Sequence, residues 1–277
     1  MTLTPGQFER AAAFEADQQR LVQLQRMSYR ELQRLLTGDP AQAALWVRSA
    51  AEYGVPAAQL RLGRMLLQGS GVERDEFAAF HWFVRAAELG DAEAMNMVGR
   101  CHENGWGVVM GLPRAVECYR SSAEAGHDWG EYNLGNMLFD GRGVLQERAQ
   151  ALHWYLCAAR RGHGRAMNLA GRCFEEGWGC TKSLGEASEW YRRSAETGYF
   201  RAQFNYAVLL AERGEGAAAA AWFSKALASG DAGLRRAALQ VLDATRDSAL
   251  VRLRERLRQA VTPGRLGNAI DNHSYSQ

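Results

Sequence analysis

The apolar residues of this chain recur at helical spacing. Over Pro56–Gln68, leucine and methionine return every three or four residues, which predicts a helix. A second helix is predicted over residues 76–89, where alanines accompany the aromatic pair Trp82 and Phe83. Between them, Gly69 suits the left-handed end of a helix and Gly71 lets the chain reverse. These elements form a helix-turn-helix unit.

The unit repeats along the chain with a period of 36 residues. The period is marked by glycines at Gly54, Gly90, Gly126, Gly162 and Gly198, and Gly230 follows after 32 residues. An aromatic column has the same period and reads Phe83, Tyr119, Tyr155, Tyr191 and Phe223, with tryptophan before four of its members. One unit cannot bury its apolar face alone, so the units must stack. The aromatic pair is expected to fill the space between neighbours.

The repeat also predicts the domain organisation. Five units span 55–230, as 55–90, 91–126, 127–162, 163–198 and 199–230. Residues 1–54 are expected to form N-terminal capping helices. They include a capping box at Ser28 and end in an orphan second helix that Asp39 caps. Residues 231–261 are expected to form two closing helices, and residues 262–277 a disordered tail. No segment has a strand pattern, so the expected fold class is all-α.

The repeated pattern resembles a known family. It reads Ala-x-x-x-Leu-Gly, Gly-x-Gly-Val, then Ala-x-x-Trp-[Phe/Tyr]-x-x-Ala-Ala-x-x-Gly, and it is similar to the Sel-one-like repeat, a relative of the tetratricopeptide repeat. The first unit carries it as Ala58, Leu62-Gly63, Gly69-Ser70-Gly71-Val72, Ala79, Trp82-Phe83, Ala86-Ala87 and Gly90. The resemblance covers 55–230 and implies a right-handed α/α superhelical solenoid that acts as a scaffold or adaptor. There are two departures. The acidic residue after Gly-x-Gly-Val survives only as Asp75, and the last unit is shortened.

Composition narrows the class of partner. The 33 basic and 31 acidic residues leave a net charge of +2, too little for the basic surface that nucleic acids usually require. The hydrophobic content of 47% is enough for a packed core. The amino terminus has no signal-peptide pattern and no segment is long and apolar enough to span a membrane, so we expect a cytoplasmic protein. A protein or peptide partner is expected, without a cofactor.

The resemblance also suggests where a partner binds. In the tetratricopeptide class, positions two, five, nine, twelve and thirteen of the first helix face the concave groove, and the first four of these positions are used here. The candidate partner-binding residues carried over in this way are Arg64, Asn96, Arg100, Glu103, Trp129, Tyr132, Asn136, Phe139, Asn168, Arg172 and Glu175. Arginine and asparagine one unit apart can hold a peptide backbone or its carboxylates, and the aromatic residues can anchor a side chain. Alternatively, the arginines form ion pairs inside the stack with Glu103 or Glu175.

Trp106 and Trp178 lie between glycines in the predicted turns. An aromatic side chain on a loop suggests contact with a partner at the edge of the solenoid. The same side chains can instead fold back onto the next helix. Both interpretations remain open from the sequence.

Sequence motifs for catalysis are absent. No nucleophile elbow, P-loop or dinucleotide fingerprint occurs, so an enzyme is not expected. His81 and His153 precede the tryptophan column and are interpreted as ordinary core or surface residues. The five cysteines support a second hypothesis, a metal- or redox-responsive binding protein, and a disulfide between Cys101 and Cys118 is conceivable. Arg252, Arg256 and Arg258, on the predicted closing helix 249–261, are interpreted as its solvated face, with contact to nucleic acid as the weaker alternative.

Overall fold

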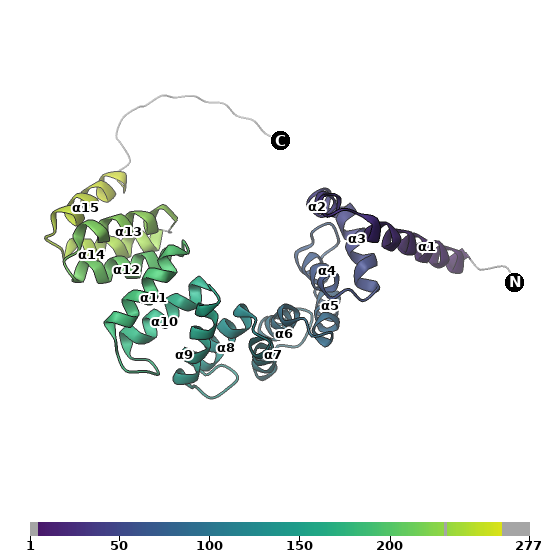
Figure 1. Ribbon diagram of the computed structural model, residues 1–277, viewed down its shortest axis with the longest axis horizontal. Helices are drawn as coiled ribbons and strands as arrows, with labels where there is room; N and C mark the ends of the chain where they lie inside the picture. Colours follow the sequence, from purple (N-terminus) through teal and green to yellow (C-terminus); the bar gives the residue numbers. More distant parts are fainter. Residues whose placement is uncertain (1–4, 230–231, 262–277) are drawn as a thin grey trace, which may run out of the picture. The chain divides into compact units, whose positions relative to one another are not determined.

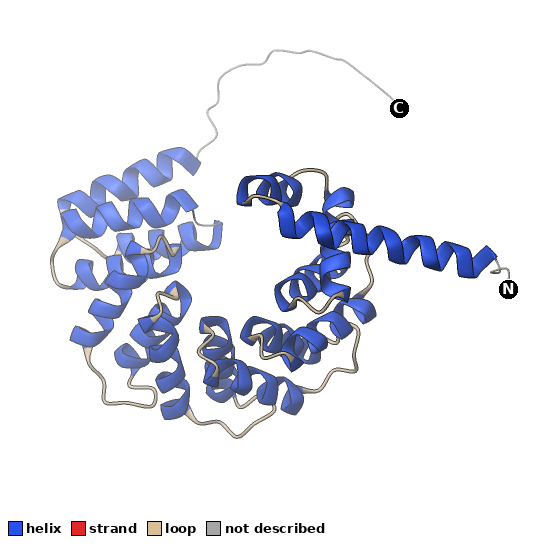
Figure 2. Ribbon diagram, turned by 45° about the vertical axis from the view of Figure 1, so that its right-hand side comes forward, coloured by secondary structure: helices blue, strands red, loops and turns tan. Residues whose placement is uncertain are grey.

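The computed structural model of the protein describes residues 5–229 and 232–261. Within these two ranges all regular secondary structure is helical and no strand occurs, as Figure 2 shows. The all-α prediction is confirmed. The predicted disordered tail, 262–277, lies outside the described residues.

The chain divides into two compact bodies, Met1–Ser183 and Leu184–Gln277. The N-terminal body holds ten helices among its described residues (Figure 1): α1 (Pro5–Arg26), α2 (Tyr29–Thr37), α3 (Pro40–Glu52), α4 (Pro56–Gln68), α5 (Glu76–Glu88), α6 (Ala92–Asn104), α7 (Leu112–Glu124), α8 (Asp128–Asp140), α9 (Arg148–Arg160) and α10 (Gly164–Glu176). The described part of the C-terminal body holds five: α11 (Leu184–Glu196), α12 (Phe200–Glu212), α13 (Gly216–Ser229), α14 (Ala232–Asp243) and α15 (Ser248–Val261).

From α4 onward, first and second helices of the repeats alternate, and we call them helix A and helix B. Each helix A, from α4 to α12, is 13 residues long. In the first four repeats helix A ends at a glycine with positive φ, for example Gly69 at 71°, whose amide donates to the carbonyl of Met65. Within the N-terminal body each helix packs on the next from α3 to α10. This is the helix-pair stacking expected of a solenoid.

The second glycine of each Gly-x-Gly pair joins consecutive repeats. Gly143 has a φ of 71°, and a methyl group on it would lie 2.5 Å from the carbonyl carbon of Leu112, the first residue of α7. The same close approach occurs in the other loops, where Gly71, Gly107 and Gly179 lie against Pro40, Glu76 and Arg148. Each loop therefore docks its backbone on the start of the preceding helix B. Since Gly71 docks on α3, that helix occupies the place of the predicted orphan helix B.

The aromatic pair on helix B is divided between core and surface. The second member of each pair is at most 2% exposed, and these residues are Phe83, Tyr119, Tyr155, Tyr191 and Phe223. The preceding tryptophan is half-buried at Trp82, Trp154 and Trp222, and buried only at Trp190. The expectation that the aromatic pair fills the core between helices holds for the second member and for Trp190, whereas Trp82, Trp154 and Trp222 enter it only in part. Helix A explains the difference, because its glycine column leaves room for the second ring: a methyl group on Gly135 would lie 2.6 Å from Cε1 of Tyr155.

The predicted capping features are present. The Ser28 hydroxyl accepts the Glu31 amide, and the Glu31 carboxylate accepts the Ser28 amide, which completes the capping box of α2. Asp39 caps α3, with Pro40 in its first turn. On α15, Leu250 and Leu253 are buried and Arg252, Arg256 and Arg258 are exposed, as the amphipathic pattern predicts.

Candidate functional site

The candidate site is the surface formed by positions two, five, nine and twelve of helix A, counted from its first residue. We call this surface the helix-A face and describe it in the N-terminal body, on α4, α6, α8 and α10. These positions are spaced by three or four residues, so they form one stripe along each helix. The structure separates the predicted residues into three groups: side chains buried in the stack, side chains paired with a neighbouring helix, and side chains open to solvent.

Two of the predicted residues are buried. Asn96 and Asn168, at position five, are each 5% exposed. The Asn96 Oδ1 accepts a hydrogen bond of 2.8 Å from Nδ2 of Asn133 on the next helix A. A buried amide needs such a partner, and here it connects two repeats. The expectation that these asparagines face a partner is therefore corrected.

Several polar residues of the face are paired within the body. Arg64 forms an ion pair with Glu93 on the next helix A. Glu103 accepts a 2.5 Å hydrogen bond from the hydroxyl of Tyr119 and pairs with Arg142 at 2.8 Å. The sequence left open whether the arginines form ion pairs inside the stack. Arg64 does so, with Glu93 in place of the expected Glu103 or Glu175.

The other position-nine and position-twelve residues differ in exposure. Asn136 is half-buried and accepts a 2.9 Å hydrogen bond from the hydroxyl of Tyr155, on helix B of its own repeat. Glu175 is also half-buried. Arg100 and Arg172 are exposed.

An aromatic cluster lies at the start of α8 and α10. Trp129 is 41% exposed, and its ring contacts Tyr132 and His163 with centroids 5.8 and 4.6 Å apart. The Tyr132 and His163 rings stack at 4.8 Å, and the guanidinium of Arg165 lies 5.4 Å from the centre of the Trp129 ring. The cluster presents a large aromatic side chain to solvent on a rigid support, as a binding anchor requires.

His163 and His127 carry structural roles that the sequence reasoning missed. Both are N-caps of helix A, where Nδ1 accepts a backbone amide at 3.1 Å from Ala166 and at 3.3 Å from Gly130. Burial lowers the pKa of His163, so the ring is neutral and can accept. The sequence contained a signal for this capping role. His127 and His163 each follow a repeat glycine directly, as Asp91 does in the second repeat, and Asp91 is the N-cap of its helix A.

The tryptophans of the loops fold back onto the body. Trp106 packs against the buried core around α4 and α5, and the guanidinium of Arg100 lies 5.1 Å from its ring centre. Trp178 has Arg172 at 5.2 Å and contacts the ring of Phe139 on α8 with centroids 5.1 Å apart. Both indoles are half-buried. The sequence left two interpretations open for these tryptophans. Their contacts favour packing against the body over side chains that project freely from the edge of the solenoid.

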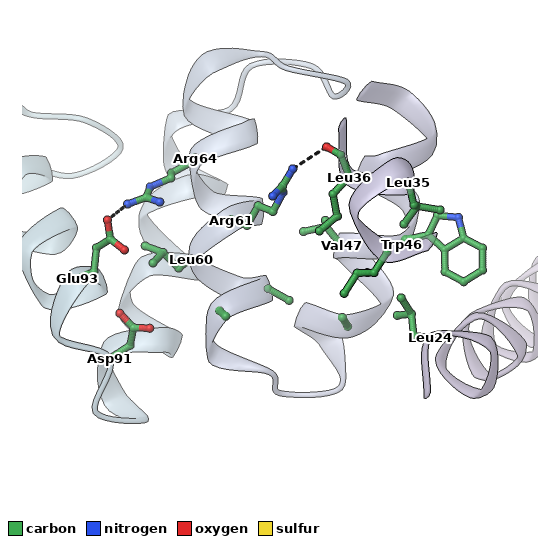
Figure 3. A pocket seen from close by; sticks show the side chains of 14 residues that line it. Leu24, Leu35, Leu36, Trp46, Val47, Leu60, Arg61, Arg64, Asp91 and Glu93 are labelled. Atoms are coloured by element: carbon green, nitrogen blue, oxygen red, sulfur yellow. Dashed lines mark hydrogen bonds and ion pairs between the residues drawn. The ribbon is translucent and has the colours of Figure 1, made fainter. Parts of the chain in front are cut away.

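A pocket of about 490 Å³ opens at the N-terminal end of the helix-A face (Figure 3). Its lining is mainly apolar and comes mostly from α1 to α4, with Leu24, Leu35 and Trp46 on one side and Leu60 on the other. The start of α6 adds Asp91 and Glu93. The residues that α4 contributes include those at positions two, five and nine, which are Ala57, Leu60 and Arg64. Mostly apolar concave surfaces with a few polar groups are typical of binding sites.

The five cysteines are free thiols. Burial raises the pKa of Cys101 and Cys173 to about 12, and it also raises the pKa of Cys118, Cys157 and Cys180. A protonated thiol is a weak nucleophile and a poor metal ligand. Within the described ranges, no three His, Cys, Asp or Glu side chains are grouped so that they could hold a metal ion.

Glu131 is a buried carboxylate on α8. It is 3% exposed; Oε1 accepts from Nε of Arg161 at 3.2 Å, and Oε2 has no hydrogen-bond partner among the described residues. The same helix-A position holds glutamine in α4 and α12, where the amides of Gln59 and Gln203 donate to a backbone carbonyl of the preceding helix B. Burial raises the pKa of Glu131 above its ordinary value of 4.5, although Arg161 opposes this.

Glu131→Gln is expected to raise the free energy of unfolding at pH 7 by about 1 kcal/mol, because glutamine can be buried without charge and donate to that carbonyl. In the wild type the raised pKa means that the Glu131 carboxyl group binds a proton more tightly in the folded state than in the unfolded state. Stability therefore falls as pH rises from 4.5 through the raised pKa. Urea denaturation at pH 4.5 and pH 7 measures both effects. The stability gained by Glu131→Gln over the wild type should be smaller at pH 4.5 than at pH 7. A variant that is less stable than the wild type at pH 7 would contradict this account of Glu131.

A comparison with protein-family models matches the Sel1 repeat at residues 56–91, 92–127, 130–163 and 164–199, just over half of the chain. The chain belongs to the Sel1 repeat family. This confirms the resemblance seen in the sequence. Sel1 repeats generally serve as protein–protein interaction scaffolds and are typically non-catalytic. The α12–α13 pair, predicted as a fifth repeat, lies beyond the matched residues.

Solved structures agree with this assignment. The Sel1 repeat protein is similar to c5321, a protective antigen of uropathogenic Escherichia coli strains with an SLR fold, at 27% identity and a TM-score of 0.71. The match covers 92% of this chain but only 56% of c5321. A Sel1 repeat protein from Oxalobacter formigenes shares the fold at 24% identity and a TM-score of 0.73, covering 84% of this chain and all of that one. A search of curated proteins gives no match.

One finding concerns membranes. Among the described residues of the Sel1 repeat protein, no helix is both long enough and apolar enough to cross a bilayer.

Proposed function

We propose that this protein is a non-catalytic scaffold or adaptor that binds a segment of a partner protein along the helix-A face of α4 to α10. The observation that carries the proposal is the pocket on this face, because α4 lines it with residues from the helix-A positions expected to meet a partner. The second support is Trp129, which stays 41% exposed on the same set of positions. A large exposed aromatic side chain on a rigid helix is a common anchor in interfaces.

The residues proposed to contact a partner follow from their exposure. Those open to solvent or half-buried on the face are proposed as contacts, and they are Arg64, Arg100, Glu103, Trp129, Tyr132, Asn136, Phe139, Arg172 and Glu175. The buried Asn96 and Asn168 are proposed to hold neighbouring helices together. Trp106 and Trp178 are proposed to support Arg100 and Arg172.

The metal- or redox-responsive alternative has less support. Burial raises the pKa of all five thiols, which keeps them protonated at neutral pH and lowers their affinity for metals and oxidants. The cytoplasm remains the proposed location, since reduced thiols are usual in that compartment.

Two substitutions test the proposed face. Trp129→Ala removes the exposed anchor, and Ala57→Phe places a bulky side chain in the pocket from an exposed position. Affinity capture from the native cell, followed by quantitative mass spectrometry, is expected to show at least one protein reduced fivefold or more with both variants. Both side chains lie at the surface, so the thermal unfolding midpoint should change little.

Gln150→Phe is the matched control, because Gln150 is exposed on α9, a helix B. It should capture the same proteins as the wild type. If the two face variants capture what the control captures, the helix-A face is not the binding surface.

A further inference from the structure

Five arginines of the N-terminal body lie over aromatic rings and have no carboxylate partner among its described residues. One of them, Arg85, is on α5, and the other four lie between α6 and α10. Arg100 lies over Trp106, Arg165 over Trp129 and Arg172 over Trp178, at 5.1 to 5.4 Å from the ring centres. Arg148, at the start of α9, lies 5.4 Å from the ring centre of Phe139 and 5.8 Å from that of Trp178. All four side chains are exposed.

Two acidic residues of the same face are already neutralised. Glu93 pairs with Arg64, and Glu103 pairs with Arg142 while it also accepts the hydroxyl of Tyr119. From α6 to α10 the face then carries three exposed arginines, Arg100, Arg165 and Arg172, and one further acidic residue, the half-buried Glu175.

The aromatic rings prepare these guanidinium groups for binding. A ring that covers one face of a guanidinium restricts its movement and leaves N–H donors at the edge, in the plane that a carboxylate uses. Part of the side-chain entropy that binding would cost has then been lost before the partner arrives. An exposed arginine held in this way is a better carboxylate ligand than a freely moving lysine.

The arrangement favours an acidic peptide over a nucleic acid. Proteins that bind single strands without sequence preference stack bases on open aromatic faces. Here arginine side chains lie over the rings of Trp106, Trp129 and Trp178.

We propose that the helix-A face from α6 to α10 binds an extended acidic segment of a protein, whose carboxylates pair with Arg100, Arg165 and Arg172. This inference rests on the proposed function and adds the chemistry of the partner. Neighbouring helices pack about 10 Å apart, so Arg100 and Arg172, two repeats apart, are about 20 Å apart. An extended chain covers about 3.3 Å per residue, so about six residues connect the two guanidinium groups.

The test uses a fluorescein-labelled 12-residue peptide of alternating glutamate and serine, with a glutamine–serine peptide as its neutral counterpart. Fluorescence anisotropy at low salt is expected to show the acidic peptide binding at least tenfold more tightly than the neutral one. The full-length variant Arg100→Gln with Arg172→Gln is expected to lose at least tenfold of that affinity. Arg100→Lys with Arg172→Lys keeps the charge but not the forked donors, and it should lose at least threefold.

The matched control is Arg85→Gln with Arg114→Gln. Arg85 lies 4.7 Å from the ring centre of Trp82 on α5, and Arg114 is exposed on α7, so this variant removes the same charge from helix B. It should lose less than twofold of the affinity. An equal loss in control and test variants, or equal binding of the neutral peptide, would overturn the proposal. Tighter binding of a 12-nucleotide single strand than of the acidic peptide would also overturn it.

The peptide-binding test and the cellular capture test can fail independently of each other. If the acidic peptide fails to bind but Trp129→Ala still abolishes capture of a cellular protein, the face binds a partner of another chemistry. If both fail, the helix-A face itself is excluded.

Discussion

Tyr155→Ala is expected to lower the free energy of unfolding by about 3–5 kcal/mol, the usual cost of removing a fully buried aromatic ring. The ring is 2% exposed and lies against Gly135 of helix A, in contact with Tyr132 and Phe139. Its removal leaves a cavity that the glycine cannot fill. Urea denaturation of the full chain, followed by circular dichroism, measures the loss.

Two neighbouring substitutions identify the source of the effect. Tyr155→Phe keeps the ring and removes only the hydrogen bond to Asn136, so it should cost about 1 kcal/mol. Trp154→Ala removes a larger side chain from a half-buried position and should cost less than half as much as Tyr155→Ala. A larger loss for Trp154→Ala would mean that the core-facing side of helix B has been assigned to the wrong residue.

Gly143→Ala is expected to cost about 3 kcal/mol, from two sources. Alanine at a φ of 71° costs about 1–2 kcal/mol on conformational grounds. The added methyl group would also lie 2.5 Å from the carbonyl carbon of Leu112, and overpacking of this kind costs about 1–3 kcal/mol. The clash is with backbone, so no change of side-chain rotamer relieves it. Thermal and urea unfolding both report the loss.

Gly162→Ala is the matched control for this prediction. Gly162 has a φ of 95°, but a methyl group on it would meet no atom within 4 Å. It should therefore show only the conformational cost, roughly 1–2 kcal/mol. Equal losses at the two positions would show that the docking of the loop on the preceding helix B contributes nothing.

The fold was largely predictable because its signals are local and repeated. The helix boundaries at Pro56–Gln68, the capping box at Ser28 and the cap at Asp39 match the structure closely. Each depends on residues within one turn of a helix end, where backbone hydrogen bonds and allowed φ angles limit the choices. The 36-residue period then identifies the stacking, since every unit must bury the same face.

The repeat alone did not predict which side of helix B faces the core. Trp154 and Tyr155 are adjacent, so they point about 100° apart on the helix, and both columns are aromatic in four of the five repeats. Which one enters the core depends on how helix A packs beside helix B. The information was present in the glycine column at Gly63, Gly99 and Gly135, but its meaning required the packed pair of helices.

The candidate site was predicted in outline and corrected in detail. Positions on a helix face could be read from the spacing, but the burial of Asn96 depends on Asn133, 37 residues away. The partners of Arg64 and Arg100 likewise lie on a neighbouring helix and in a loop. The contacts of Asn96 and Arg64 depend on the distance between repeats, and that of Arg100 on the path of the loop after its own helix; the period of the sequence contains neither.

The most direct test of a binding role for the helix-A face is photo-cross-linking in the native cell. Benzoylphenylalanine is placed at Trp129 or Ala57 on the helix-A face, and at the exposed Gln150 on helix B in a third variant. The account predicts the same cross-linked partner from positions 129 and 57 and none from position 150. A partner that cross-links from position 150, with none from positions 129 and 57, would contradict it.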